Sequence, residues 1–198
     1  MCGIAGLIHK GKSSNVGREM TAMLQALKHR GPDSTGYAVY GEPTEGDYVL
    51  RLKVAEAEDM AKGRGIHQVL ADRITEVEAI MQEHGVTVKT KENATEYALR
   101  YLISHEGDTT ALAGLIEETD GVEILSHGNG LELIKDLGDA SDVAGLYGLN
   151  EFNGTLGIGH TRMATESDVD IRSAHPYWAF PYNDVSVVHN GQITNYWI

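Results

Sequence analysis

Met1-Cys2-Gly3-Ile4-Ala5-Gly6 opens the chain, and the interpretation of the rest depends on this stretch. If Met1 is removed, Cys2 becomes the first residue and carries both a thiol and a free α-amine. An α-amine has a pKa of about 7.7–8.0, which suits a general base near neutral pH. A thiol with a pKa of about 8.5 is a good nucleophile once a base takes its proton. Cys2 could therefore supply nucleophile and base together; the alternative is an incidental cysteine near a chain end.

Composition is typical of a soluble globular protein. The chain has 198 residues, enough for one domain or one domain with a large insertion. Its formal charge of −13 argues against binding to nucleic acid or to anionic membranes. A single cysteine excludes an internal disulfide, and the sequence has neither an apolar run of about 20 residues nor a signal-peptide core. We therefore expect a cytoplasmic protein.

The first 41 residues predict a strand, a helix and a second strand. Residues 2–8 are apolar and end at a turn, and residues 16–29 repeat apolar side chains at helical spacing. The helix is expected to end at Arg30-Gly31-Pro32-Asp33, before a strand at 37–40. This tetrapeptide is either an ordinary helix end with a tight turn or a cation and a bend placed beside the returning strand.

The middle of the chain, residues 42–148, predicts a small α/β unit inserted into the main fold. Its apolar runs and turn signals carry little chemistry. They indicate strands at 47–54, 86–88, 121–126 and 131–137, and helices at 66–84, 95–102, 108–116 and 142–147.

The last 50 residues carry the remaining candidate chemistry. A strand rich in small residues, 155–160, leads to Arg162 and Thr165, which could clamp a carboxylate through a guanidinium fork and a hydroxyl. His175 is a candidate site residue or a structural histidine. Asn190-Gly191 could supply the two donors of an oxyanion hole or could be a plain turn.

Five motifs in this order resemble one family. They are Cys2-Gly3-Ile4, Arg30-Gly31-Pro32-Asp33-Ser34, Gly159-His160-Thr161-Arg162-Met163-Ala164-Thr165, Ala174-His175-Pro176 and His189-Asn190-Gly191-Gln192-Ile193. Together they resemble the glutaminase domain of class II glutamine amidotransferases, which belong to the N-terminal-nucleophile hydrolases. The run from Gly157 to Ser167 and the long insertion bring the chain closest to the amidotransferase subunits of glutamate-synthase-like systems. In the core the resemblance covers residues 1–41 and 149–198.

The resemblance implies a role for each site residue. Cys2 would attack the side-chain amide of glutamine, and its α-amine would shuttle the proton, releasing ammonia and leaving a thioester for water to hydrolyse. Asn190 and the Gly191 N–H would hold the oxyanion. Substrate binding would involve Arg162, Thr165, His175, Arg30 and Gly31: Arg162 and Thr165 at the glutamine α-carboxylate, His175 lining the pocket, and Arg30 and Gly31 near the Cys2 amine.

The resemblance also implies a fold and a partner. The fold is an α+β, four-layer α/β/β/α sandwich with antiparallel sheets, here incomplete, with the α/β insertion at 42–148. The ammonia would pass to a synthase partner, and its acceptor stays open between glutamate synthase, N-methylglutamate synthase and other uses. No cofactor is expected in this chain, while FMN and iron–sulfur clusters would belong to the partner.

The sequence departs from the family after Asn190-Gly191, because the acidic residue that binds the glutamine α-amine lies further downstream in the family. We therefore expect weak or no activity from residues 1–198 alone. Two alternatives remain: a non-catalytic glutamine-sensing or interaction module, and a metal site built from His160, His175 and His189, whose spacing matches no compact ligand motif.

Overall fold

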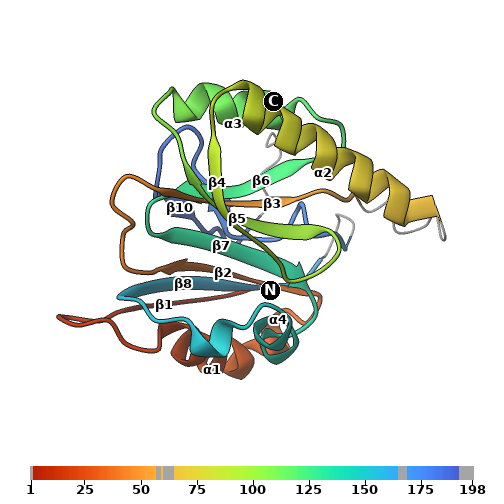
Figure 1. Cartoon of the computed structure of the whole chain (residues 1–198). Coiled ribbons are helices and arrows are strands. Elements are labelled where there is room, and N and C mark those ends of the chain that lie inside the picture. The colour runs from red at the N-terminus through yellow and green to blue at the C-terminus, as the bar shows by residue number, and fades with distance from the viewer. Residues whose placement is uncertain (1, 57–58, 60–64, 165–168, 192–198) are drawn as a thin grey trace.

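The computed structural model describes residues 2–56, 59, 65–164 and 169–191. Figure 1 shows four layers: helices, a sheet, a second sheet and helices again. Both large sheets are antiparallel throughout. The combination of helices with antiparallel sheets, which the family resemblance implies, is therefore confirmed. Among the described residues, no helix has the length and apolar character that a membrane span requires.

The first sheet contains β1, which follows Cys2, and β8, which ends at Arg162. Its strand order is β1-β8-β2-β7. The α1 and α4 helices pack against one face of this sheet through Met20, Leu24 and Val143, which are almost fully buried. The elements are β1 (Gly3–Ile8), α1 (Val16–Ala26), β2 (Ser34–Tyr40), β7 (Leu131–Leu137), α4 (Ala140–Leu146) and β8 (Leu156–Arg162), with short 3-10 turns η1 (Lys28–Arg30) and η4 (Leu149–Glu151).

Small residues on β8 explain how closely α1 approaches the sheet. A Cβ on Gly157 or Gly159 would lie 2.5–3.1 Å from side-chain atoms of Met20 and Leu24. The glycine-rich character of this strand therefore serves helix packing on one face. The opposite face, which includes His160 and Arg162, is left for the candidate site because successive side chains of a strand alternate.

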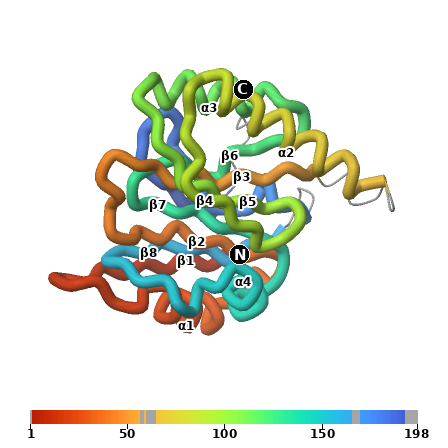
Figure 2. The backbone as a smooth tube through the Cα atoms, in the orientation of Figure 1, coloured from red at the N-terminus to blue at the C-terminus, as the bar shows by residue number. Residues whose placement is uncertain are grey.

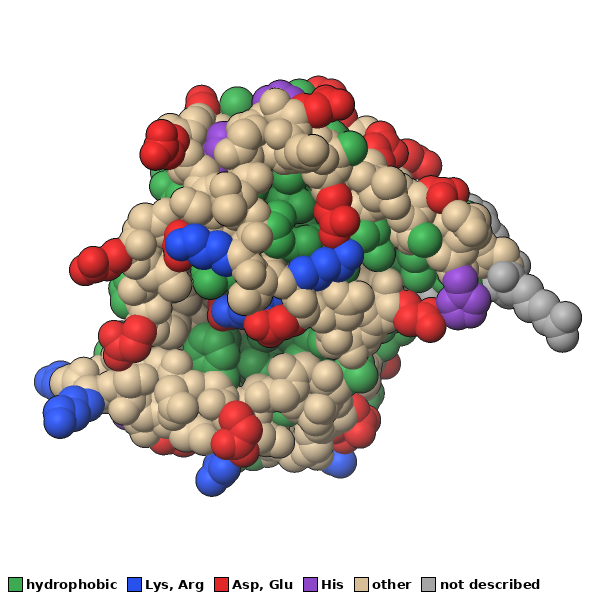
Figure 3. Space-filling view, in the orientation of Figure 1, with side chains coloured by type: hydrophobic (Ala, Val, Ile, Leu, Met, Phe, Trp, Pro, Cys, Tyr) green, Lys and Arg blue, Asp and Glu red, His purple; other side chains and the backbone are tan. Residues whose placement is uncertain are grey.

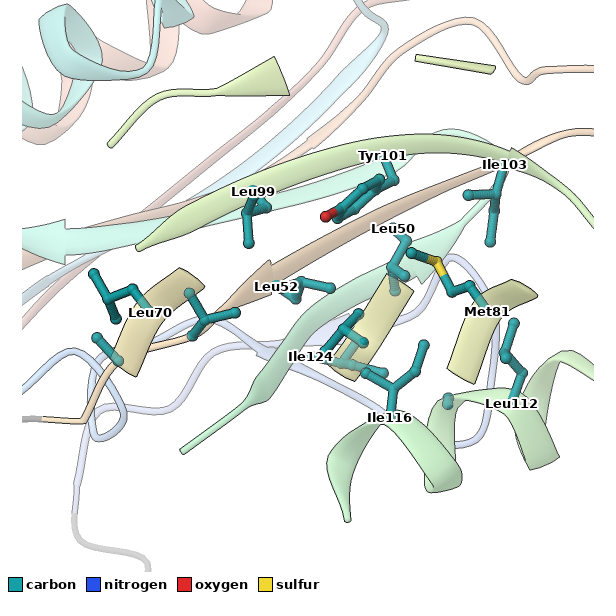
Figure 4. Close-up of a cluster of buried hydrophobic side chains, with 14 residues drawn as sticks. Leu50, Leu52, Leu70, Met81, Leu99, Tyr101, Ile103, Leu112, Ile116 and Ile124 are labelled. Carbon is teal, nitrogen blue, oxygen red and sulfur yellow. The ribbon is translucent and has the colours of Figure 1, made fainter. Parts of the chain in front are cut away.

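The second sheet has the order β4-β5-β3-β6 and its own core. Figure 4 shows that core, in which side chains of the sheet meet α2 and α3. Leu52, Tyr101, Met81 and Ile116 are essentially inaccessible to solvent. The elements are β3 (Tyr48–Lys53), α2 (Ile66–Glu83), β4 (Thr87–Asn93), β5 (Ala98–Ser104), α3 (Thr109–Glu117) and β6 (Glu123–Gly128).

Residues 42–148, expected as an inserted subregion, are divided between the two halves of the molecule. They build the whole second sheet with α2 and α3, but they also add β7 and α4 to the first half. All seven residues of β7 pair with β2. The path of the chain between the two sheets can be followed in Figure 2.

One element expected from the sequence is wrong. Residues 95–102 were expected to form a helix capped by Thr95, but β5 occupies Ala98–Ser104. Leu99, Tyr101 and Ile103 alternate with more exposed residues and face the core, which is the two-residue period of a strand. Thr95 caps the turn before the strand instead, since its hydroxyl oxygen accepts the N–H groups of Tyr97 and Ala98.

A two-stranded ribbon lies beside β6 of the second sheet and contacts β2 of the first. It consists of β9 (Tyr177–Trp178) and β10 (Ser186–Val187). Tyr40 of β2 bonds Ser186 at 2.9 Å, and the Asp184 carboxylate accepts the backbone N–H groups of Asn129, Gly130 and Leu131. The ribbon is therefore fixed to the turn before β7, and it carries the chain on to His189-Asn190-Gly191.

Candidate active site

Cys2 lies directly before β1, beside the end of β8. Gly3 pairs with Thr161, so extending this register by one residue sets Cys2 opposite Arg162. Its Sγ is 4.0 Å from the Met163 carbonyl oxygen, and the side chain is partly buried. The thiol is thus held at the sheet end while remaining partly open to solvent.

Two residues far apart in the sequence contact the carbonyl oxygen of Cys2. Arg30 donates to it from Nε at 3.2 Å, and Asn190 donates from its side-chain amide, also at 3.2 Å. The structure therefore brings together three of the predicted motifs, those at residues 2, 30 and 190, around one peptide group.

Gly31 serves close packing. A Cβ at this position would lie 2.5 Å from the carbonyl oxygen of Thr161 and 2.5 Å from the carbonyl carbon of Arg162. Only glycine lets the turn after η1 approach the end of β8 this closely. Gly31 therefore supports Arg30 by setting the position of the turn.

Arg162 is the last residue of β8 and is buried, with a relative accessibility of 6%. It lies on the same face of β8 as His160, two residues earlier. Its carbonyl oxygen accepts the N–H of Asp33, whose carboxylate accepts the Ala164 N–H at 2.7 Å. Thr165, the second residue of the expected carboxylate clamp, lies outside the described residues.

His175 and His160 form a stacked pair on the inner face of the first sheet. Their ring centroids are 4.7 Å apart, and the planes differ by 27°. Tyr177 contacts the His175 ring at 4.5 Å, and the backbone N–H of His189 donates to His175 Nδ1 at 3.2 Å. Asn190 and Gly191 follow in the same exposed turn.

Both stacked histidines are held in the neutral form. Burial lowers the pKa of His160 to about 4, and the positive charge of Arg162 adds to the effect. Burial also lowers the pKa of His175 to about 3, helped by His160 and the Lys135 ammonium group. Neutral rings can accept hydrogen bonds at one nitrogen. In the described part of the chain, no three His, Cys, Asp or Glu side chains form a group able to hold a metal ion.

Sequence reasoning missed the structural roles of three residues in this region: Asp33, Gly36 and His160. Asp33 was within a quoted motif, but its function of binding the backbone after β8 depends on the fold. The backbone carbonyl of His175 rests where a Cβ of Gly36 would be. The His160 ring was weighed only as a metal ligand. Gly36 of β2 pairs with His160 of β8, and no sequence pattern reveals which residues of two strands pair.

Comparison with known proteins agrees with this arrangement. The model of the glutamine amidotransferase domain family matches residues 1–131. A putative glutamine amidotransferase of Methanothermobacter thermautotrophicus is 39% identical over 200 residues, covering 100% of this chain and 63% of that protein. The glutamine amidotransferase-like protein GlxB of Rhizobium meliloti is 32% identical over 199 residues, covering 99% of this chain and 60% of that protein.

More distant relatives share only a part of the chain. An amidophosphoribosyltransferase of Methanothermobacter thermautotrophicus is 33% identical over 100 residues, 50% of this chain and 19% of that protein. The chain spans about three fifths of the length of the two relatives that it matches from end to end. The family model covers most of the chain, so the chain belongs to the glutamine amidotransferase domain family.

Proposed function

We propose that this chain hydrolyses the side-chain amide of glutamine, with Cys2 as the nucleophile of an N-terminal-nucleophile hydrolase. Removal of Met1 frees the α-amine of Cys2, which takes the thiol proton. Sγ attacks the amide carbon, the C–N bond breaks with a proton delivered to the leaving nitrogen, and ammonia departs. Water then cleaves the thioester to give glutamate and the free thiol.

The observation that supports this reaction is the convergence on Cys2 of Arg30 and Asn190. Both donors lie 3.2 Å from the Cys2 carbonyl oxygen, so the Asn190 amide is held within one residue of the thiol. A donor so placed can stabilise the oxyanion that forms when Sγ attacks. The adjacent Gly191 N–H is the second proposed donor.

Substrate orientation is assigned to Arg162, with Thr165 as its proposed companion. The guanidinium fork of Arg162 matches the α-carboxylate of glutamine, and its burial strengthens that interaction. We further propose that the ammonia passes to a synthase partner of the glutamate-synthase type, and that any flavin or iron–sulfur cluster is held by that partner.

Labelling with 6-diazo-5-oxo-norleucine tests the proposal in the full-length protein. We expect one equivalent of label on Cys2 by peptide mass spectrometry, protection by glutamine, and loss of glutaminase activity in Cys2→Ala. Asn190→Ala should lower kcat by about 10²–10³-fold, the usual effect of losing one oxyanion donor. Glutamine binding without labelling or turnover would instead favour the sensing module, and a Met1 cap retained on active protein would exclude the mechanism.

A further inference from the structure

The Asn190-Gly191 turn needs an anchor, because its residues are exposed. His189, Asn190 and Gly191 all have high accessibility, and exposed turns hold no fixed geometry without specific contacts. The turn is tied to the protein interior by a hydrogen bond from the His189 N–H to His175 Nδ1, at 3.2 Å. The position of Asn190 relative to Cys2 therefore depends on the position of the His175 ring.

The His175 ring is fixed from several sides. It contacts the His160 ring and the Tyr177 ring, with centroid distances of 4.7 Å and 4.5 Å. The carbonyl of His175 rests on Gly36 in β2, and the Tyr177 hydroxyl donates to the Ser173 carbonyl at 3.1 Å. His175 is itself 93% buried, with a relative accessibility of 7%. A ring confined in this way is a rigid support for an exposed turn.

We propose that His175 is a positioning residue for glutamine hydrolysis: its Nδ1 accepts the His189 N–H and so fixes the turn that delivers Asn190 to Cys2. The His160 ring, which stacks on His175 with centroids 4.7 Å apart, helps to hold it in place. This inference rests on the proposed function and changes the role expected for His175, which acts through the turn and not as a wall of the glutamine pocket.

The protonation state of His175 is part of this role. Nδ1 can accept the His189 N–H only if it carries no proton, so the single ring proton lies on Nε2. The groups that face the ring are His160 and Arg162 from β8, Lys135 from β7 and His189 from the turn itself. The two cations among them, together with burial, keep the ring neutral through the whole physiological range of pH.

Steady-state kinetics of the full-length protein separate the two roles. In His175→Phe the ring packing is kept but the acceptor is lost, and we expect kcat for glutamine to fall about 10–100-fold with KM changed less than about threefold, since small misplacements of catalytic groups cost up to about 10²-fold. In His175→Asn the side-chain oxygen stands the same number of bonds from Cα as Nδ1. This variant should recover kcat to within about tenfold of the parent protein.

His127→Phe is the matched control. His127 is also a buried histidine in an aromatic stack, with its ring 5.0 Å from Tyr48, but its polar contact is to Asn183 in the ribbon. We expect this variant to keep the parent kcat even where it lowers stability. A parallel kcat loss in His127→Phe and His175→Phe would show a general packing effect and overturn the proposal.

A raised KM with unchanged kcat in His175→Phe would also overturn it, because that is the result expected of a pocket wall. If His175→Phe does not fold, 15N NMR of the parent protein decides: a proton on Nδ1 at neutral pH is incompatible with the acceptor role. If the parent protein neither consumes glutamine nor is labelled at Cys2, the proposed function fails and the catalytic role of the turn fails with it.

Discussion

His160 shows how much a single buried side chain can cost. It is 1% exposed, and neither ring nitrogen has a partner at hydrogen-bond geometry among the described residues, although the His189 backbone is near enough to raise the pKa of the ring slightly against burial. An unsatisfied buried polar group costs about 1–3 kcal/mol. Its ring nevertheless stacks on His175, so the aromatic surface contributes packing while the nitrogens contribute none of the hydrogen bonds that would offset their burial.

His160→Phe should therefore make the protein less sensitive to acid. The pKa of His160 is about 4 in the folded protein and about 6.5 in the unfolded chain, so the unfolded chain takes up a proton first as the pH falls. Stability from this group is complete above pH 6.5 and is lost between pH 6.5 and about 4. At pH 4.5 the loss is about 2–3 kcal/mol.

Urea unfolding at pH 7 and pH 4.5 measures this effect directly. We expect the difference in free energy of unfolding between the two pH values to be about 2 kcal/mol smaller in His160→Phe than in the parent protein. Any cost of fitting the larger ring is present at both pH values and cancels in the difference. Equal differences in the two proteins would mean that His160 is not buried in its neutral form.

Arg162 and Arg30 should respond differently to replacement by lysine. Lysine keeps the charge but loses the planar fork that matches a carboxylate. Arg162→Lys should raise KM for glutamine about tenfold with a smaller change in kcat, because about 1.4 kcal/mol of binding corresponds to a factor of ten. Arg30→Lys loses the Nε donor to the Cys2 carbonyl and should mainly lower kcat. The same steady-state assay compares both, and a reversed pattern would exchange the two roles.

Much of this site follows from the order of motifs in the sequence, but its internal support does not. The sequence motifs predict Cys2, Arg30 and Asn190 as site residues, and the three meet at one carbonyl oxygen. The sequence groups His175 with His189 only as metal-ligand candidates, and it does not predict the hydrogen bond between them. Every residue except proline has a backbone N–H, so a hydrogen bond to that group cannot be predicted from the residue type of the donor.

At the scale of elements, the site depends on how closely the 173–176 segment can approach β2. The His175 carbonyl occupies the place of a Cβ on Gly36, and Gly36 lies between His160 of β8 and Lys135 of β7 in the sheet. A glycine in the middle of a strand weakens that strand unless it permits such a contact. The absence of a side chain at Gly36 therefore permits the close approach of the His175 backbone.

Gly36→Ala should lower both stability and activity. The added methyl group displaces the His175 backbone, at a cost of about 1–3 kcal/mol for overpacking, and it moves the anchor of the 189–191 turn. Gly114→Ala in α3 is the control, because a Cβ there meets nothing within 4 Å. Alanine in a helix interior should stabilise the protein by about 0.5–1 kcal/mol. Thermal unfolding and kcat measured on both variants check this contrast, and equal behaviour would contradict it.

Elements differ in how far the sequence determines them. The expected strand at 131–137 and the β7 bounds are the same, and α2 lies within the expected helix, since each has a clear apolar period and turn signals at both ends. Residues 98–104 contain Leu99, Tyr101 and Leu102, a spacing that fits a helix as well as a strand. The choice is made by pairing with β3 on one side and β4 on the other, which is information held elsewhere in the chain.

At the scale of the whole molecule, the two halves meet along a seam that contains charged side chains. Figure 3 shows hydrophobic side chains along this seam, with basic and acidic side chains beside them. Glu132 of β7 reaches across to the second sheet, where it binds Arg51 of β3 at 2.7 Å and Arg100 of β5 at 2.8 Å. Arg51 and Arg100 are direct partners in the β3–β5 register, so one carboxylate separates two facing cations.

The pKa of Glu132 reflects this placement. Burial alone would raise it, but hydrogen bonds from Arg100 and the charge of Arg51 outweigh burial and hold it below its usual value. The stability that Glu132 contributes is therefore present above the ordinary glutamate pKa of about 4.3 and is lost as the pH falls through the lower, folded value. This inter-sheet contact was not predictable, because it depends on how the sheets stack and not on the pattern within either.

Glu132→Gln should accordingly be among the most destabilising substitutions in the chain. It removes the charge while keeping the size, and it leaves two partly buried guanidinium groups facing each other beside a buried amide, at a cost of about 3 kcal/mol. Glu92→Gln is the matched control: Glu92 pairs with the same Arg100 at 3.1 Å, but its side chain is 61% exposed, so the loss should stay below about 1 kcal/mol. Urea unfolding at pH 7 measures both. Below about pH 4, the two variants should differ less in the free energy of unfolding that they lose relative to the parent protein. Glu132 is then partly protonated in the unfolded parent chain, so the parent has already lost part of this stability. Similar losses at pH 7 would mean that the seam is solvated and that the halves are joined mainly by their apolar contacts.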